Sequence, residues 1–159
     1  MTLDELGDAQ ASPDAGELRV FARSDGLYSR NSAGSEKRFA TADQLFVSPP
    51  FSHSGDLATG TGSFKFYNDS GRTLTITAVR ASLGTAPTGA SVILDVNING
   101  TTIYTTQANR PTIAVSQFTV KNTTMDVTAW ADGDYLTVDI DQIGSTVKGA
   151  NLTVTIWAM

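Results

Sequence analysis

The chain has 159 residues, of which 16 are acidic and 11 basic, giving a formal net charge of −5 at pH 7. Hydrophobic residues make up 40% and charged residues 17% of it, which suits one compact domain with a small appendage and excludes a disordered chain. The acidic balance argues against nucleic acid or an anionic membrane as a partner, and the lack of cysteine excludes disulfides and thiolate chemistry. His53 is the only histidine, which excludes most catalytic triads. No apolar run approaches the length of a membrane span and the N-terminus lacks the pattern of a secretion signal, so no membrane insertion is expected.

Residues 1–47 are predicted to form a small β-meander. The segment Glu17–Arg23 alternates so that Leu18 and Val20 share one face of a strand and Phe21 lies on the other. Residues 24–26 and 31–34 have the composition of turns, and a second strand is expected between them. A sheet with so few strands exposes nearly as much apolar surface as it buries. The meander must therefore pack on the rest of the chain or on copies of itself around a threefold axis. In the second case, the predicted trimer interface consists of Leu18, Val20, Leu27 and Tyr28.

Residues 48–62 are predicted to be a connector between this meander and a second domain. Pro49 and Pro50 remove two backbone donors and stiffen the chain, and small residues follow them. Charge density also falls here, because 13 charged residues occupy the first 53 positions and 14 occupy the remaining 106. The two sides of the connector are therefore expected to be separate domains.

Residues 63–159 are predicted to form an antiparallel β-sandwich of the jelly-roll type, so the expected fold class is all-β. β-Branched residues and period-two alternation recur here between short clusters of turn residues. The most specific local signal is Asn99-Gly100, since a two-residue Asn-Gly loop requires positive φ at both positions. It fixes a hairpin with Ile98 opposite Thr101 and Val96 opposite Ile103. The eight expected strands cover residues 63–68, 73–83, 91–98, 101–106, 117–120, 125–129, 135–140 and 152–158.

Several stretches resemble segments of tailed-bacteriophage virion proteins. Residues 12–34 contain a proline, a glycine, a strand with alternating basic residues, Asp25-Gly26-Leu27-Tyr28 and a second turn, in an order similar to a motif of phage fibre, spike and minor tail proteins. Residues 87–101 and 130–141 are similar to C-terminal β-sandwich domains of virion proteins in phages of actinobacteria. The resemblance implies a non-enzymatic, often trimeric structural protein whose N-terminal part attaches or trimerises and whose C-terminal part projects.

The short length favours a short spike, head fibre or capsid decoration protein over a long tail fibre. The resemblance then implies a homotrimer that contacts phage capsid or tail proteins on the virion surface, after synthesis in the cytoplasm of a bacterial host. The alternative is a tail-associated receptor-binding module that recognises host-surface polysaccharide. An enzyme acting on host polymers requires a carboxylic acid of raised pKa beside a second carboxylate, and no pattern in the sequence marks one, so no enzymatic activity is expected.

Four aromatic residues are candidates for stacking on a sugar, because an aromatic face packs on the apolar face of a pyranose ring. They are expected at outward positions of strands or at strand ends. The same residue types also fill sandwich cores and subunit interfaces, so both interpretations stay open. The four candidates are Trp130, Tyr135, Trp157 and Tyr104.

A cluster of carboxylates occurs in an Asp-Gly-Asp turn and on the outward face of the strand that follows it. A hard cation such as Ca²⁺ takes about six to eight oxygen ligands, some of which this cluster offers. The spacing does not match an EF-hand loop, and aspartate is also a common turn and solvent-face residue, so no cofactor is expected. The four carboxylates belong to Asp132, Asp134, Asp139 and Asp141.

Overall fold

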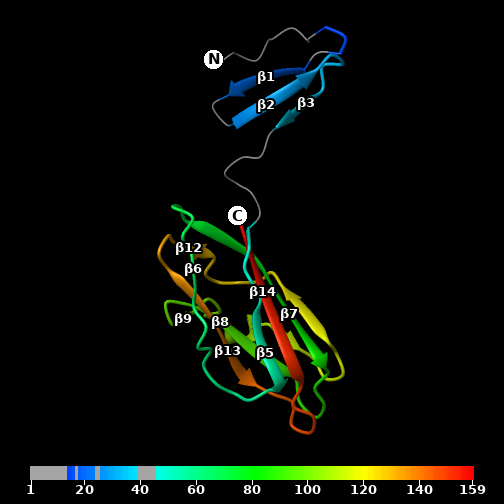
Figure 1. The fold of residues 1–159 in the computed structure, drawn as a ribbon. Helices are drawn as coiled ribbons and strands as arrows, with labels where there is room; N and C mark the ends of the chain where they lie inside the picture. Colours follow the sequence, from blue (N-terminus) through cyan, green and yellow to red (C-terminus); the bar gives the residue numbers. More distant parts are fainter. Residues whose placement is uncertain (1–13, 17, 24–25, 39–45) are drawn as a thin grey trace. The chain divides into compact units, whose positions relative to one another are not determined.

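The computed structural model describes residues 14–16, 18–23, 26–38 and 46–159. The chain divides into two compact units, Met1–Gln44 and Leu45–Met159, and most of their strands are labelled in Figure 1. Both units are built from antiparallel strands, and the helical structure in the described residues is one 3₁₀ turn at Gln107–Asn109. The predicted all-β class is therefore confirmed.

The first unit contains a three-stranded meander of β1 (Leu18–Arg23), β2 (Gly26–Asn31) and β3 (Glu36–Arg38). The predicted meander is confirmed, and the two faces of β1 differ in exposure. Phe21 is only 5% exposed whereas Val20 is 45% exposed. The register places Phe21 opposite Tyr28, and the two rings stack with centroids 5.9 Å apart. Alternation separates the two faces of a strand but does not say which face is covered, and here the face with the larger aromatic side chain is buried.

Two of the four residues predicted to form the trimer interface are only partly described. The strand positions of Leu18 and Leu27 are given, whereas their side chains lie outside the described part of the chain. The other two differ in exposure, since Val20 faces solvent and Tyr28 is half-buried against Phe21. Among the predicted interface residues whose side chains the structure describes, Val20 is therefore the one with an exposed apolar side chain.

The second unit is a β-sandwich. Seven of the eight predicted strands occur with their ends shifted by several residues, whereas of the predicted strand 125–129 only Ala129 lies in a strand. The strands Phe51–Asp56 and Thr112–Ile113 were not predicted. The edge-to-edge order of one sheet is β5-β14-β7-β11, and that of the other is β6-β13-β8-β10. The chain passes from one sheet to the other at almost every connection, and these two orders are those of a jelly roll. The main strands are β5 (Phe51–Asp56), β6 (Phe66–Tyr67), β7 (Leu74–Thr85), β8 (Val92–Ile98), β10 (Thr112–Ile113), β11 (Thr119–Asn122), β13 (Tyr135–Gln142) and β14 (Ala150–Ala158).

Three short strands complete the sheets. β4 (Phe46–Val47) pairs with the end of β14, β12 (Ala129–Trp130) pairs with the start of β7, and β9 (Thr101–Thr102) pairs with β8. The β8–β9 hairpin has the predicted register, with Ile98 opposite Thr101. Asn99 and Gly100 have φ of 51° and 81°, as the two-residue loop requires.

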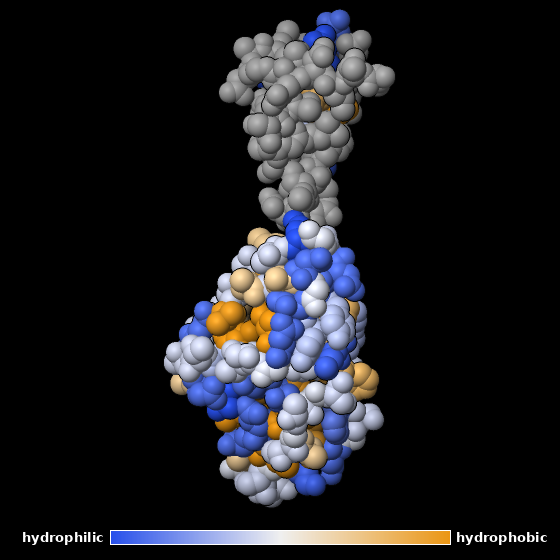
Figure 2. Space-filling view, turned by 90° about the vertical axis from the view of Figure 1, so that its left-hand side faces the viewer, coloured by the Kyte–Doolittle hydropathy of each residue, from blue (hydrophilic) through white to orange (hydrophobic). Residues whose placement is uncertain are grey.

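The core lies between the two sheets and consists of the inward-facing residues of the long strands. Leu136, Val138 and Ile140 of β13 are buried, as the alternation of that strand predicts. In Figure 2, hydrophobic residues reach the surface of the sandwich in small patches set among polar ones. The other large core side chains include Leu74, Ile76, Val92, Leu94, Ile103, Ile113, Trp130, Leu152, Val154 and Ile156.

The segment predicted as a connector, residues 48–62, contains an edge strand of the sandwich. β5 pairs with β14 along its whole length, with Phe51 opposite Val154 at one end and Asp56 opposite Ala150 at the other. Phe51 packs against the core and Leu57 is fully buried, so the segment contributes apolar contacts that a free linker lacks. The prolines lie before β5, where their missing N–H groups disturb no ladder.

Candidate functional site

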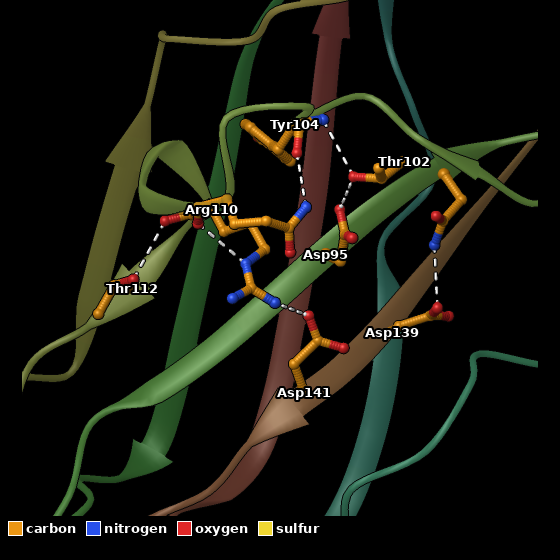
Figure 3. A network of polar contacts seen from close by, with 9 residues as sticks. Asp95, Thr102, Tyr104, Arg110, Thr112, Asp139 and Asp141 are labelled. Atoms are coloured by element: carbon orange, nitrogen blue, oxygen red, sulfur yellow. Dashed lines mark hydrogen bonds and ion pairs between the residues drawn. The ribbon is translucent and has the colours of Figure 1, made fainter.

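A polar surface covers the outer side of β8 and β13. The antiparallel register sets Asp95 directly opposite Asp139 and Asn97 opposite Thr137, with Asp141 further along β13. We call these five residues the polar sheet face. Asp95, Asn97 and Thr137 are buried although they point away from the core. Neighbouring polar side chains surround them, as Figure 3 shows for Asp95.

Specific hydrogen bonds hold the carboxylates of this face. The Thr102 hydroxyl donates to Asp95 Oδ1 at 2.7 Å, and the Asn97 amide donates to Asp139 Oδ2 at 2.9 Å. Arg110 forms an ion pair with Asp141, also visible in Figure 3. Each carboxylate is therefore already bound within the fold, as a structural polar network requires.

Burial raises the pKa of Asp95 above its ordinary value of 3.8, and the nearby charge of Asp141 raises it further. The Thr102 hydrogen bond acts in the opposite direction but does not cancel the burial. The folded state thus binds a proton at Asp95 more readily than the unfolded state does. By linkage, proton binding at Asp95 stabilises the folded state. This contribution to the unfolding free energy is complete below pH 3.8 and is lost as the pH rises through the raised pKa.

We expect Asp95→Asn to remove this pH dependence. Urea unfolding at several pH values from about 3 to 7 measures it as the slope of the unfolding free energy against pH. Asp126→Asn is the control of opposite sign, because the backbone N–H of Thr106 lowers the pKa of Asp126. The stabilisation from Asp126 is lost as the pH falls. An unchanged slope in Asp95→Asn contradicts the prediction.

The four aspartates predicted as a metal cluster do not come together. In the described part of the chain, no group of three or more His, Asp or Glu side chains is arranged to hold a metal ion. Asp132 accepts a hydrogen bond from the Gly71 N–H, and Asp134 accepts one from the Asn99 amide. These two lie at the turn before β13, whereas Asp139 and Asp141 engage Asn97 and Arg110 along the strand. The carboxylates of the turn and those of the strand therefore form separate sets of contacts.

Two of the four residues predicted to stack on a sugar are in the core. Trp130 and Tyr104 are both 0% exposed, so neither ring has a free face. For these two the sugar-stacking interpretation is wrong and the core-filling one holds, because β12 and the segment after β9 turn them into the core. Tyr135 and Trp157 are half-buried, but they lie on β13 and β14, which belong to different sheets. The four residues therefore do not form one site.

An exposed aromatic pair exists that the sequence did not reveal. The β6–β13 register places Tyr67 opposite Tyr135, with ring centroids 5.6 Å apart and planes at 55°. Tyr67 is 45% exposed, and Lys65 Nζ lies 4.3 Å from the centre of the Tyr135 ring. We call Tyr67 and Tyr135 the tyrosine pair. It depends on which strand lies beside β13, and no local pattern in residues 63–68 specifies that neighbour.

No family model, curated protein or solved structure matches the chain. Among the residues that the structure describes, no helix is long and apolar enough to cross a membrane. The function is therefore inferred from the residues of the chain and from its fold.

Proposed function

We propose that this protein is a non-enzymatic structural component of a tailed-phage virion: a short trimeric spike, head fibre or capsid decoration protein. The observation that carries the proposal is the combination of a jelly-roll sandwich with a separate small β-sheet unit. Jelly rolls recur in viral capsid domains and in lectins, so the architecture supports a role on a particle surface by analogy. The resemblance of residues 12–34 to phage fibre and spike proteins supports the same role.

The first unit is the part proposed to attach or trimerise. A three-stranded sheet has little surface to bury against itself, and it leaves the apolar Val20 side chain 45% exposed. In a closed threefold trimer, one kind of contact between neighbouring chains covers this side chain in all three of them. The sandwich is proposed to project from the virion surface, with capsid or tail proteins as the partners of the first unit.

We expect the purified protein to have a molar mass near three times 16.8 kDa by light scattering. Val20→Asp places a charge in the proposed interface and is expected to lower the mass to that of a single chain. Ser32→Asp adds the same charge at an exposed turn of the same unit and is expected to leave the trimer intact. A wild-type mass near 16.8 kDa contradicts self-trimerisation. Antibody labelling of intact particles tests the virion location separately.

Recognition of a host-surface polysaccharide is the second candidate, and the tyrosine pair favours it. Two partly exposed rings on one sheet face offer apolar surface to a sugar, and their hydroxyl groups offer hydrogen bonds. The neighbouring Asn99 and Asp134 side chains hydrogen-bond each other at 2.6 Å and add polar groups beside Tyr135.

We expect any binding of host wall polysaccharide to fall at least about tenfold in Tyr67→Ala, because stacking contributes on the order of 1 kcal/mol per ring and the hydroxyl adds a hydrogen bond. Trp157→Ala is the control, since it removes a half-buried ring from the other sheet. Sedimentation with purified cell walls measures the bound fraction. Equal losses in both variants argue against the tyrosine pair as the site.

A further inference from the structure

The outward side chains at β6 are set by the inward residue between them. Phe66 packs against the core, and its ring centroid lies 5.8 Å from that of Phe46. Because successive side chains of a strand point to opposite faces, Lys65 and Tyr67 both point outward. The β6–β13 register places Tyr67 opposite Tyr135, so Lys65 is the diagonal neighbour of Tyr135 on the same face. The packing of the core thus places a lysine beside the tyrosine pair.

The ammonium group of Lys65 lies against the tyrosine pair. Its Nζ atom is 4.3 Å from the centre of the Tyr135 ring, which is a cation–π distance. The centre of that ring is in turn 5.6 Å from the centre of the Tyr67 ring. A group attached to a sugar that stacks on Tyr67 is therefore within reach of the ammonium. The contact with Tyr135 also restricts the rotamers of Lys65, so less conformational freedom is lost when a ligand binds.

The positive charge of Lys65 is not neutralised within the described part of the chain. No Asp or Glu that the structure describes forms an ion pair with this lysine, and its side chain is exposed. Asp139, on the outer face of β13, is already bound by neutral donors. Its Oδ1 accepts from the Gly62 N–H at 2.7 Å and its Oδ2 accepts from the Asn97 amide at 2.9 Å. Lys65 therefore offers a free cation to a ligand.

The other end of the tyrosine pair carries a hydrogen-bond acceptor. Because β6 and β13 are antiparallel, Asp134 lies beside the end of β6, whereas Lys65 lies at its start. The Oδ1 atom of Asp134 accepts a hydrogen bond from the Asn99 amide at 2.6 Å. A carboxylate accepts at both of its oxygens, so Asp134 also suits a sugar hydroxyl. The opposite charges at the two ends orient a ligand with its acidic group toward Lys65.

We propose that the tyrosine pair and Lys65 together bind an acidic sugar, a hexuronate residue of a host-surface polysaccharide. This assignment rests on the polysaccharide recognition given above as the second candidate function, and it adds the class of sugar. In a hexuronate the carboxylate is attached directly to the pyranose ring. One residue therefore stacks on Tyr67 and pairs with the Lys65 ammonium at the same time. The single positive charge of Lys65 matches the single negative charge of the carboxylate.

Trigalacturonate and its methyl ester test this proposal, because they share the same sugar rings and differ in whether the carboxyl groups are charged. The full-length protein with ¹³C-labelled tyrosine rings is titrated with each trisaccharide at low salt. Both trisaccharides should shift the ring signals of Tyr67 and Tyr135. We expect trigalacturonate to bind about two- to fivefold more tightly than the ester, the range of one exposed ion pair. About 0.5 M NaCl should remove most of this difference.

Three variants assign the preference to one side chain. Lys65→Gln should abolish the preference for the charged trisaccharide and leave the affinity for the ester within about twofold. Lys65→Arg keeps the charge and should keep the preference. Lys148→Gln, which removes an exposed lysine from the loop between β13 and β14, should keep it too. The spectrum of each variant shows whether it is folded.

The outcomes separate this proposal from the candidate function on which it rests. If both trisaccharides shift the rings but bind equally, or if the preference survives in folded Lys65→Gln, the acidic-sugar proposal alone is overturned. If neither trisaccharide shifts either ring, the tyrosine pair is not a sugar site, and polysaccharide recognition there fails together with the proposal.

Discussion

Trp130→Ala is expected to destabilise the sandwich by about 3–5 kcal/mol, the range found when a buried tryptophan is truncated. The indole of Trp130 is fully buried, and its ring lies 5.9 Å from the rings of both Phe46 and Phe66. Phe46 belongs to β4 in one sheet and Phe66 to β6 in the other, so the indole joins the two sheets at this end. Its Nε1–H also donates to the Asp134 carbonyl at 3.0 Å. Truncation opens a cavity and removes one of the two donors to that carbonyl, which keeps its hydrogen bond from the Asn68 N–H at 2.9 Å.

The other tryptophan of the chain provides the control. Trp157 is half-buried and lies under Lys121, whose Nζ is 4.6 Å from the ring centre. We expect Trp157→Ala to cost about 1 kcal/mol, because most of its loss is surface packing and a partly exposed cation–π contact. Urea unfolding followed by circular dichroism measures both values. Equal costs for the two variants contradict the assignment of Trp130 as the residue that joins the sheets.

We expect Gly62→Ala to lower the free energy of unfolding by about 2 kcal/mol, which is in the range found when a close contact is overpacked. A Cβ atom at this position lies 2.0 Å from the carbonyl oxygen of Val138, a backbone atom that cannot rotate away. The segment must therefore move off β13, which also breaks the hydrogen bond from the Gly62 N–H to Asp139. The edge of the sheet formed by this segment loosens as a result.

Gly60→Ala is the matched control for Gly62→Ala. Gly60 lies two residues earlier in the same segment, and a Cβ atom there meets no other atom within 4 Å. We expect Gly60→Ala to change the unfolding free energy by less than about 0.5 kcal/mol. Thermal or urea unfolding of the two variants under one set of conditions gives the comparison. A stable Gly62→Ala variant shows that the segment is free to shift away from β13.

The secondary structure was predictable from the sequence because its signals are local. Alternation of apolar and polar residues predicted most of the sandwich strands, although not β5 or β10, and Asn99-Gly100 predicted the register of the β8–β9 hairpin. In both cases, the residues that carry the signal are neighbours along the chain, and their φ angles and side-chain directions do not depend on the partner strand. The boundary at residues 48–62 was less predictable, since prolines and small residues are as common before an edge strand as in a linker.

The candidate site was predictable only in part. Tyr135 was identified from the sequence as an outward aromatic residue of its strand, but its partner Tyr67 was not. Trp130 and Tyr104 were candidates for sugar stacking with core filling left open as the alternative, and the structure buries both. The face of a strand that is covered depends on what packs against it, which the strand itself does not encode.

The sequence by itself determined the class of this protein: an acidic, cysteine-free, all-β chain with a small meander before a sandwich. The tertiary structure alone decided that Tyr67 stands beside Tyr135, that Asp95 faces Asp139, and that β5 and residues 58–64 leave a cavity between them. The two side-chain pairs unite segments far apart in the chain, and β13 and β14 complete the wall of the cavity. Their alignment depends on how the two sheets pack and on the register of strands that are not neighbours in sequence, and no single segment contains that information.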